Sequence, residues 1–221
     1  MPLSRLFWQA DSAFPGGSFG FSNGIEALAA AGDLSTARAL GEALALLLRH
    51  RWACFDRVAL ARAYWSADDL DLVAACDRLV EVSSLVAPLR EGSSRNGRAF
   101  LTTHDKLGTP GAGDYLRRIR AGTAPGHLAV AQGLVWARLG IPPEEAVALS
   151  HYTTATALTQ AAVRLGAIGA IEAQRALVHA LDASADLVVL PAPGEDLSSF
   201  TPFVDIAVQR HMRADVRFFA N

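Results

Sequence analysis

The hydrophobic positions of this chain recur mostly at intervals of three and four residues, which is the repeat of amphipathic α-helices. The longest clear example begins near Ser35 and carries one apolar stripe. Its members are Leu40, Ala43, Leu44, Leu47, Leu48 and Phe55. Arg49, Arg51 and Arg57 lie off this stripe. The pattern therefore predicts a helix with one face buried in a core.

Start and stop signals place the boundaries of further helices. Asn23, three residues before Glu26, forms a capping-box variant that predicts a short helix over 25–31, and Gly32 is placed to end it. Further along, acidic residues or prolines precede several apolar-periodic segments, as helix starts require. The remaining predicted helices cover approximately residues 70–87, 89–106, 114–120, 127–139, 143–165, 172–181 and 204–213.

Strand signals are almost absent. Leu187 to Leu190 is the one short β-like run, whereas roughly forty alanines favour helix throughout the chain. We therefore predict an all-α, single-domain multi-helix bundle of about eight to ten helices with no significant sheet. Residues 1–24 form a glycine- and aromatic-rich segment, 25–190 the helical core, and 191–221 a loop, helix and tail. We expect the two end segments to be mobile alone and ordered by a partner.

Composition excludes several classes of protein. Hydrophobic residues make up 51% of the 221 residues, charged residues make up 19%, and the net charge is −2. This balance is too apolar for disorder and not basic enough for binding nucleic acid. The longest uncharged run, 146–163, contains many polar side chains, which favours a buried helix of a soluble protein over a membrane span.

The ends and the cysteines suggest a cytoplasmic protein. The N-terminus has no apolar region of the kind found in secretory signal peptides. Cys54 and Cys76 are far apart in the sequence and lack metal-site spacing, so we expect reduced, core-filling thiols.

Motifs for catalysis or cofactors are missing. The glycines at 17–24 lack the lysine of a phosphate-binding loop, and Ser18 lacks the spacing of a hydrolase nucleophile. The six histidines are scattered without ligand spacing, so we predict no metal site and no cofactor. A small all-helical enzyme remains the alternative, and it would need a pocket where Asp, His and Arg side chains converge, such as Asp56, His151 and Arg164.

Two features could serve binding. Arginines cluster at Arg90, Arg95 and Arg98 and again over 117–120, and they form either a solvated face or a docking surface for a carboxylate-rich partner. Aromatic side chains are frequent among the N-terminal glycines, where they either fold under the helices or contact another protein. They are Phe7, Trp8, Phe14, Phe19 and Phe21.

The segment 11–26 resembles the opening of the urease accessory protein F (UreF) family. Matching positions in this first block are Asp11, Ser12, Pro15, Gly17, Phe19, Ser22, Gly24 and Glu26. A second block matches at Arg90, Ser93, Gly97 and Arg98, and a third at Gly126, His127 and Gly133. Later matches are Arg164, Leu165, Gly166, Gly169 and Gln174, then His211, Arg217 and Phe219. The blocks cover nearly the whole chain in the order of the family.

This resemblance implies a non-catalytic helical protein that helps to insert nickel into urease. It implies a homodimer that binds a UreD- or UreH-type accessory protein, recruits a UreG-type GTPase, and supports GTP-dependent nickel delivery to apo-urease. The residues that the resemblance offers as partner-interface candidates are Pro15, Gly17, Phe19, Ser22, Glu26, Arg90, Ser93, Arg98, Arg164, Gln174, His211, Arg217 and Phe219.

Arg164 has two possible roles. It closes an otherwise uncharged helix, where a guanidinium interacts favourably with the C-terminal carbonyls. Alternatively, Gly166 and Gly169 allow another backbone to approach while Arg164 forms a bidentate pair with a partner's carboxylate. The sequence leaves both open.

Overall fold

The computed structural model describes residues 3–16, 24–32, 34–192 and 194–211. Within these ranges the chain is helical and contains no β-strand, which confirms the all-α prediction. The elements are α1 (Ser4–Ala10), α2 (Ile25–Ala30), α3 (Ala37–Leu47), η2 (Leu48–Asp56), α4 (Arg57–Trp65), α5 (Leu70–Ser83), α6 (Ala87–Lys106), α7 (Ala112–Arg120), α8 (Leu128–Arg138), α9 (Pro143–Arg164), α10 (Ala170–Ala183), η3 (Ala185–Leu187) and α11 (Pro202–His211). The β-like run at 187–190 follows the short 3₁₀ turn η3 and is not a strand.

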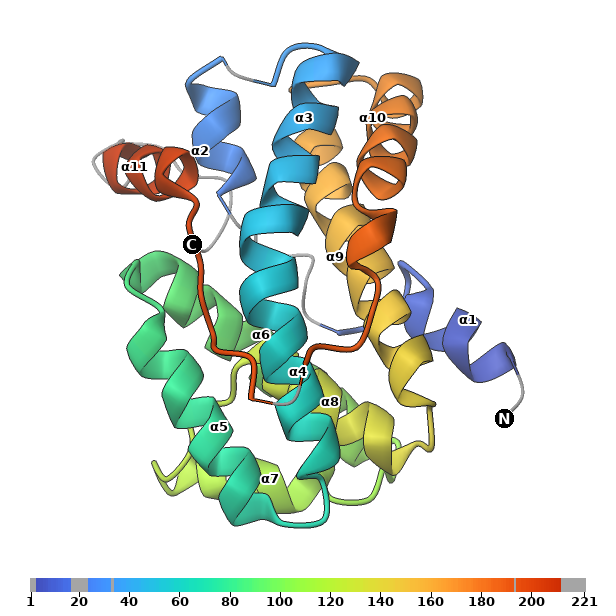
Figure 1. The fold of residues 1–221 in the computed structure, drawn as a ribbon, viewed down its shortest axis with the longest axis vertical. Coiled ribbons are helices and arrows are strands. Elements are labelled where there is room, and N and C mark those ends of the chain that lie inside the picture. The colour runs from blue at the N-terminus through green and yellow to red at the C-terminus, as the bar shows by residue number, and fades with distance from the viewer. Residues whose placement is uncertain (1–2, 17–23, 33, 193, 212–221) are drawn as a thin grey trace.

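A continuous helical column of α3, η2 and α4 runs through the middle of the molecule (Figure 1). Its upper part packs on α10 and its lower part on α8. The contact with α8 is close because Gly133 lies directly against the carbonyl oxygen of Leu60, where a Cβ would overlap the backbone. Gly133, one of the residues of the third block, therefore serves helix packing.

The middle of the column, η2, is a π-helix and not the regular α-helix that the apolar spacing predicts. A π-helix has a wider turn, so it changes which side chains face the core between α3 and α4. Leu48, Trp52 and Phe55 are buried in it. The guanidinium of Arg51 lies over the ring of Phe55, 3.9 Å from its centroid.

Most predicted helix boundaries agree with the structure. The side chain of Asp69 caps α5 by accepting hydrogen bonds from the amides of Asp71 and Leu72, and α9 begins at Pro143. Gly32 follows α2 with a φ of +84°, as a helix-ending glycine does. The N-cap of α2 is Gly24, however, and not Asn23.

Helix α1 is absent from the helices that the sequence predicts. It has seven residues and no side-chain cap, so local signals for it are weak. It is held by long-range contacts: the guanidinium of Arg5 donates to the carbonyl of Leu139, and Gln9 is buried.

A C-terminal strap, residues 188–192 and 194–201, crosses the central column and leads to α11 (Figure 1). The amides of Ser198 and Phe200 donate to the carbonyls of Cys54 and His50 in η2. Arg57, only 8% exposed, donates to the carbonyl of Val189 and pairs with Glu195 at 2.8 Å. Arg57 is thus off the apolar stripe but buried under the strap.

Cys54 is half-buried and Cys76 is buried, and both are free thiols, as expected. Burial raises the pKa of the Cys76 thiol to about 12, so this cysteine stays protonated. In the described part of the chain, we find no helix with the length and apolar character that crossing a membrane requires.

Candidate functional site

The carboxylate of Asp77 is fully buried in the middle of α5 and is bonded to two other parts of the fold. It accepts three hydrogen bonds: from the Tyr115 hydroxyl at 2.7 Å, from the Gly126 amide at 2.6 Å and from the His127 amide at 2.9 Å. The three donors come from α7 and from the turn before α8. Asp77 therefore ties α5, α7 and α8 together.

Burial raises the pKa of Asp77, while the bonds from His127, Tyr115 and Gly126 act in the opposite direction. Burial, and after it the neighbouring carboxylate of Asp77, raises the pKa of Tyr115, whose hydroxyl stays protonated as a donor. A buried carboxylate is tolerated only where such donors replace its lost hydration. We call Asp77 and its three donors, on Tyr115, Gly126 and His127, the Asp77 clamp. The clamp depends on the path of the backbone at Gly126.

Residues from the second and third family-like blocks meet at this turn. Gly97 lies so close to the carbonyl of Gly126 that a Cβ would overlap the oxygen. The hydroxyl of Ser93 accepts a hydrogen bond from the amide of Leu128 at 3.4 Å, and the guanidinium of Arg98 donates to the carbonyl of Pro125. These residues, distant in sequence, join α6 to the turn.

Glu81 links the same region to Arg90. One of its carboxylate oxygens lies 3.1 Å from Nε of Arg90, and the other lies 2.8 Å from Nε2 of the buried His127. Arg90 also donates to the carbonyl of Ser84 at 2.9 Å. Arg90, Ser93 and Arg98 therefore lie together, as neighbours of the Asp77 clamp.

The first block is described only in part. Gly17, Phe19 and Ser22 lie outside the described residues. The carbonyl of Pro15 accepts a hydrogen bond from the Thr103 hydroxyl at 2.6 Å. Phe14 packs against Trp8, Phe100 and His104, so these N-terminal aromatics fold onto α6.

His104 anchors α1 to the core. The indole of Trp136 can only donate, and it donates to Oε1 of Gln9 at 3.0 Å, which fixes that atom as the oxygen. The Nε2 of His104 lies 3.3 Å from the same oxygen and carries the proton, so Nδ1 accepts from the Thr109 hydroxyl at 2.9 Å. Burial lowers the pKa of His104 to about 4, and its ring is neutral.

The ends of the chain also meet. Glu26 on α2 is 2% exposed, and its Oε1 lies 3.4 Å from Nε2 of His211 at the end of α11. This contact brings the first block to the last. Arg217 and Phe219 lie outside the described residues.

The remaining two candidate interface residues, Arg164 and Gln174, lie away from these clusters. Arg164 is half-buried in the last turn of α9, and burial lowers its pKa. Gln174 is exposed on α10. Neither lines the Asp77 region.

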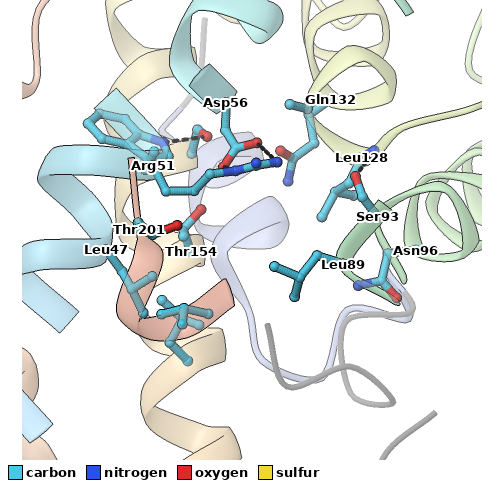
Figure 2. A pocket seen from close by; sticks show the side chains of 15 residues that line it. Leu47, Arg51, Asp56, Leu89, Ser93, Asn96, Leu128, Gln132, Thr154 and Thr201 are labelled. Atoms are coloured by element: carbon cyan, nitrogen blue, oxygen red, sulfur yellow. Dashed lines mark hydrogen bonds and ion pairs between the residues drawn. The ribbon is translucent and has the colours of Figure 1, made fainter. Parts of the chain in front are cut away.

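A partly open cavity of about 100 Å³ lies between η2, α6, α8 and α9. Figure 2 shows the ion pair of Arg51 and Asp56 facing Gln132, with Ser93 and Asn96 across the cavity. His151 and Arg164 do not line it. Instead, Nε2 of His151 lies 2.7 Å from the Ser184 hydroxyl, and its ring packs on Trp52. The three residues of the enzyme alternative are therefore not gathered in this cavity.

Over the ranges that the structure describes, no group of three or more His, Cys, Asp or Glu side chains is placed to hold a metal ion.

The fold and these clusters define an all-helical protein whose motif residues brace its helices, turns and ends against one another. A family model for UreF matches residues 34–181. The urease accessory protein UreF of Trichodesmium erythraeum is 31% identical over 98% of this chain and 95% of its own length. UreF 1 of Brucella melitensis is 31% identical over 99% and 92%. UreF of a Bacillus species is 29% identical over 98% of both chains. The chain belongs to the UreF family of urease accessory proteins.

Several residues of these clusters were not identified from the sequence. Asp77 is the clearest, although a signal was present: an acidic residue stands on the buried face of α5 between Val73 and Val80. Gln9 carried no such signal, because its partners His104 and Trp136 are distant in sequence. Arg78 and Glu81 also belong to the region around the turn.

We predict that Asp77→Asn lowers the free energy of unfolding by about 2–4 kcal/mol, because an amide has one acceptor oxygen and leaves a backbone N–H of Gly126 or His127 without an acceptor. Tyr115→Phe should cost less, about 1.5–2 kcal/mol, since both amide bonds remain. Urea unfolding of both variants measures this, with the exposed Asp182→Asn as control. Equal stability of Asp77→Asn and the control would contradict the clamp.

Because His104 is buried with a lowered pKa, we predict that the folded protein loses stability in acid. An imidazole in the unfolded chain titrates near a pKa of about 6.5, whereas in the folded chain its pKa is about 4. The unfolded state therefore binds more protons between these values, so stability is highest above pH ~6.5 and falls towards pH ~4, by up to about 3 kcal/mol. Urea unfolding across this range should show a smaller loss for His104→Gln. An NMR titration that protonates the His104 ring near pH 6.5 in the folded protein would contradict the prediction.

Proposed function

We propose that this protein is a non-catalytic component of the urease maturation machinery. In this proposal it is a cytoplasmic homodimer that binds a UreD- or UreH-type accessory protein and a UreG-type GTPase. The complex supports GTP-dependent transfer of nickel, as cargo, into apo-urease. The partners and the nickel step come from the resemblance to the UreF family.

The observation that carries the proposal is that the motif residues hold the backbone of the protein in place. Gly97, Gly126 and Gly133 permit close backbone approach, and Ser93 and Arg98 bond to backbone atoms. Such residues build a rigid shape, and a rigid shape is what an adaptor between proteins requires.

Exposed apolar side chains support the proposal that this chain binds other proteins. Helix α5 presents Leu72, Leu79 and Val82 to solvent, α1 presents Phe7, and α10 presents Ile171. Apolar side chains that gather on one exposed helix face, as Leu72 and Leu79 do on α5, are typical of interaction sites. We propose Arg164 and Gln174, with the N-terminal candidate Pro15 and the C-terminal candidate His211, as further contact residues. Glu26 is buried, so in this proposal it acts through its contact with His211.

Reconstitution from purified proteins tests this function. The chain is mixed with the UreD- and UreG-type proteins of the same organism, and the complex is measured by light scattering. Apo-urease, nickel and GTP are then added, and ammonia release is followed. We expect urease activation that requires this chain and GTP, and no GTP hydrolysis or sub-micromolar nickel binding by the chain alone. Equal activation without the chain would contradict the proposal.

A further inference from the structure

A surface hollow of about 450 Å³ lies between α5, α6 and the connection from α7 to α8. Three guanidinium groups line it, from Arg78 on α5 and from Arg90 and Arg98 on α6. Glu81 and Glu91 complete its charged lining. We call this feature the arginine hollow.

The guanidiniums differ in how their charge is compensated. Arg90 pairs with Glu81 at 3.1 Å. Arg78 donates to the carbonyl of Thr123 at 3.1 Å, and Arg98 donates to the carbonyl of Pro125 at 3.3 Å. Within the described ranges, the hydrogen bonds of Arg78 and Arg98 thus go to uncharged acceptors. The nearby Asp71 is paired with Arg118, which lowers the pKa of that carboxyl most, and Arg78 lowers the same pKa to a smaller extent.

The hollow is rigid before any partner arrives. Its wall at 122–125 is followed directly by Gly126 and His127, whose amides are bonded to the buried Asp77. The hydroxyl of Thr123 donates to the carbonyl of Arg118, which closes the other end of this wall. Side chains anchored to a fixed wall lose little entropy on binding, which favours recognition.

The charge of the lining selects the ligand. Three arginines and two glutamates leave a net charge of one positive, which a single carboxylate balances. A phosphate dianion or the many charges of a nucleic-acid backbone would bring more negative charge than this lining compensates. A guanidinium presents a planar fork that matches the two oxygens of a carboxylate.

We propose that the arginine hollow is a docking site for an Asp or Glu side chain of a protein partner, held by Arg78 and Arg98 while Glu81 stays with Arg90 and His127. This inference rests on the proposed function, because the partner is one of the proteins of the maturation complex. It adds the chemistry of the contact and two residues, Arg78 and Arg98, that receive the partner's acidic group.

The test measures the affinity of this chain for the purified UreD-type and UreG-type proteins by calorimetry. We expect Arg78→Gln with Arg98→Gln to weaken binding of one partner by about tenfold or more, while the variant stays folded. Arg98→Lys should recover only part of the affinity, because an ammonium lacks the fork. The control carries Arg38→Gln and Arg175→Gln, which remove exposed arginines paired within their own helices, and should bind as the wild type does.

The outcomes separate the two claims. If the wild type binds a partner and the double variant binds both partners equally well, the arginine hollow is not a docking site, and the proposed function survives. If the wild type binds neither partner, the proposed function fails and the inference fails with it. If millimolar inorganic phosphate displaces the partner and shifts the NMR signals of the hollow, the ligand is an anion of another class and the carboxylate assignment is overturned. Should the double variant unfold, Arg78→Gln alone decides, since Arg78 is exposed.

Discussion

The structure depends most on one buried negative charge. A carboxylate on the inner face of a helix is costly unless hydrogen-bond donors converge on it. Asp77 satisfies this condition only when the turn at Gly126 and His127 and the hydroxyl of Tyr115 are all in place. The requirement fixes α7 and the start of α8 relative to α5, and it also fixes the wall against which Arg78 and Arg98 are held.

Two other polar clusters attach the end segments of the chain to the core, also by hydrogen bonds between remote residues. Gln9 is bound by Trp136 and His104, so the short helix α1 is attached to the core in spite of its weak helical signals. The side chain of Arg57 and two backbone carbonyls of η2 hold the C-terminal strap by hydrogen bonds. The strap leads to α11, which packs against α2. Polar contacts between remote segments thus decide where the surfaces of this helical protein lie, while apolar burial supplies most of its stability.

The sequence predicted those parts of the fold that depend on local signals. The cap at Asp69, the proline at the start of α9 and the glycine after α2 are chemical signals within one turn of the boundary that they set. The family-like blocks could also be found, but not the reason for their spacing. Gly97 and Gly126 match the family because one backbone passes directly against the other, a contact between residues far apart in sequence. The same holds for Asp77, whose three donors lie 38, 49 and 50 residues away. The π-helix has no sequence signal of this kind. It lies where the column changes from packing on α10 to packing on α8.

Amide hydrogen exchange of the native protein, followed by NMR, tests the Asp77 clamp most directly. The amides of Gly126 and His127 precede α8 and have no helical hydrogen bond, yet their bonds to Asp77 should make them exchange as slowly as the amides in the middle of α8. Exchange of these two amides at the rate of exposed loop amides would contradict the account, because the turn would then be held by something other than the buried carboxylate.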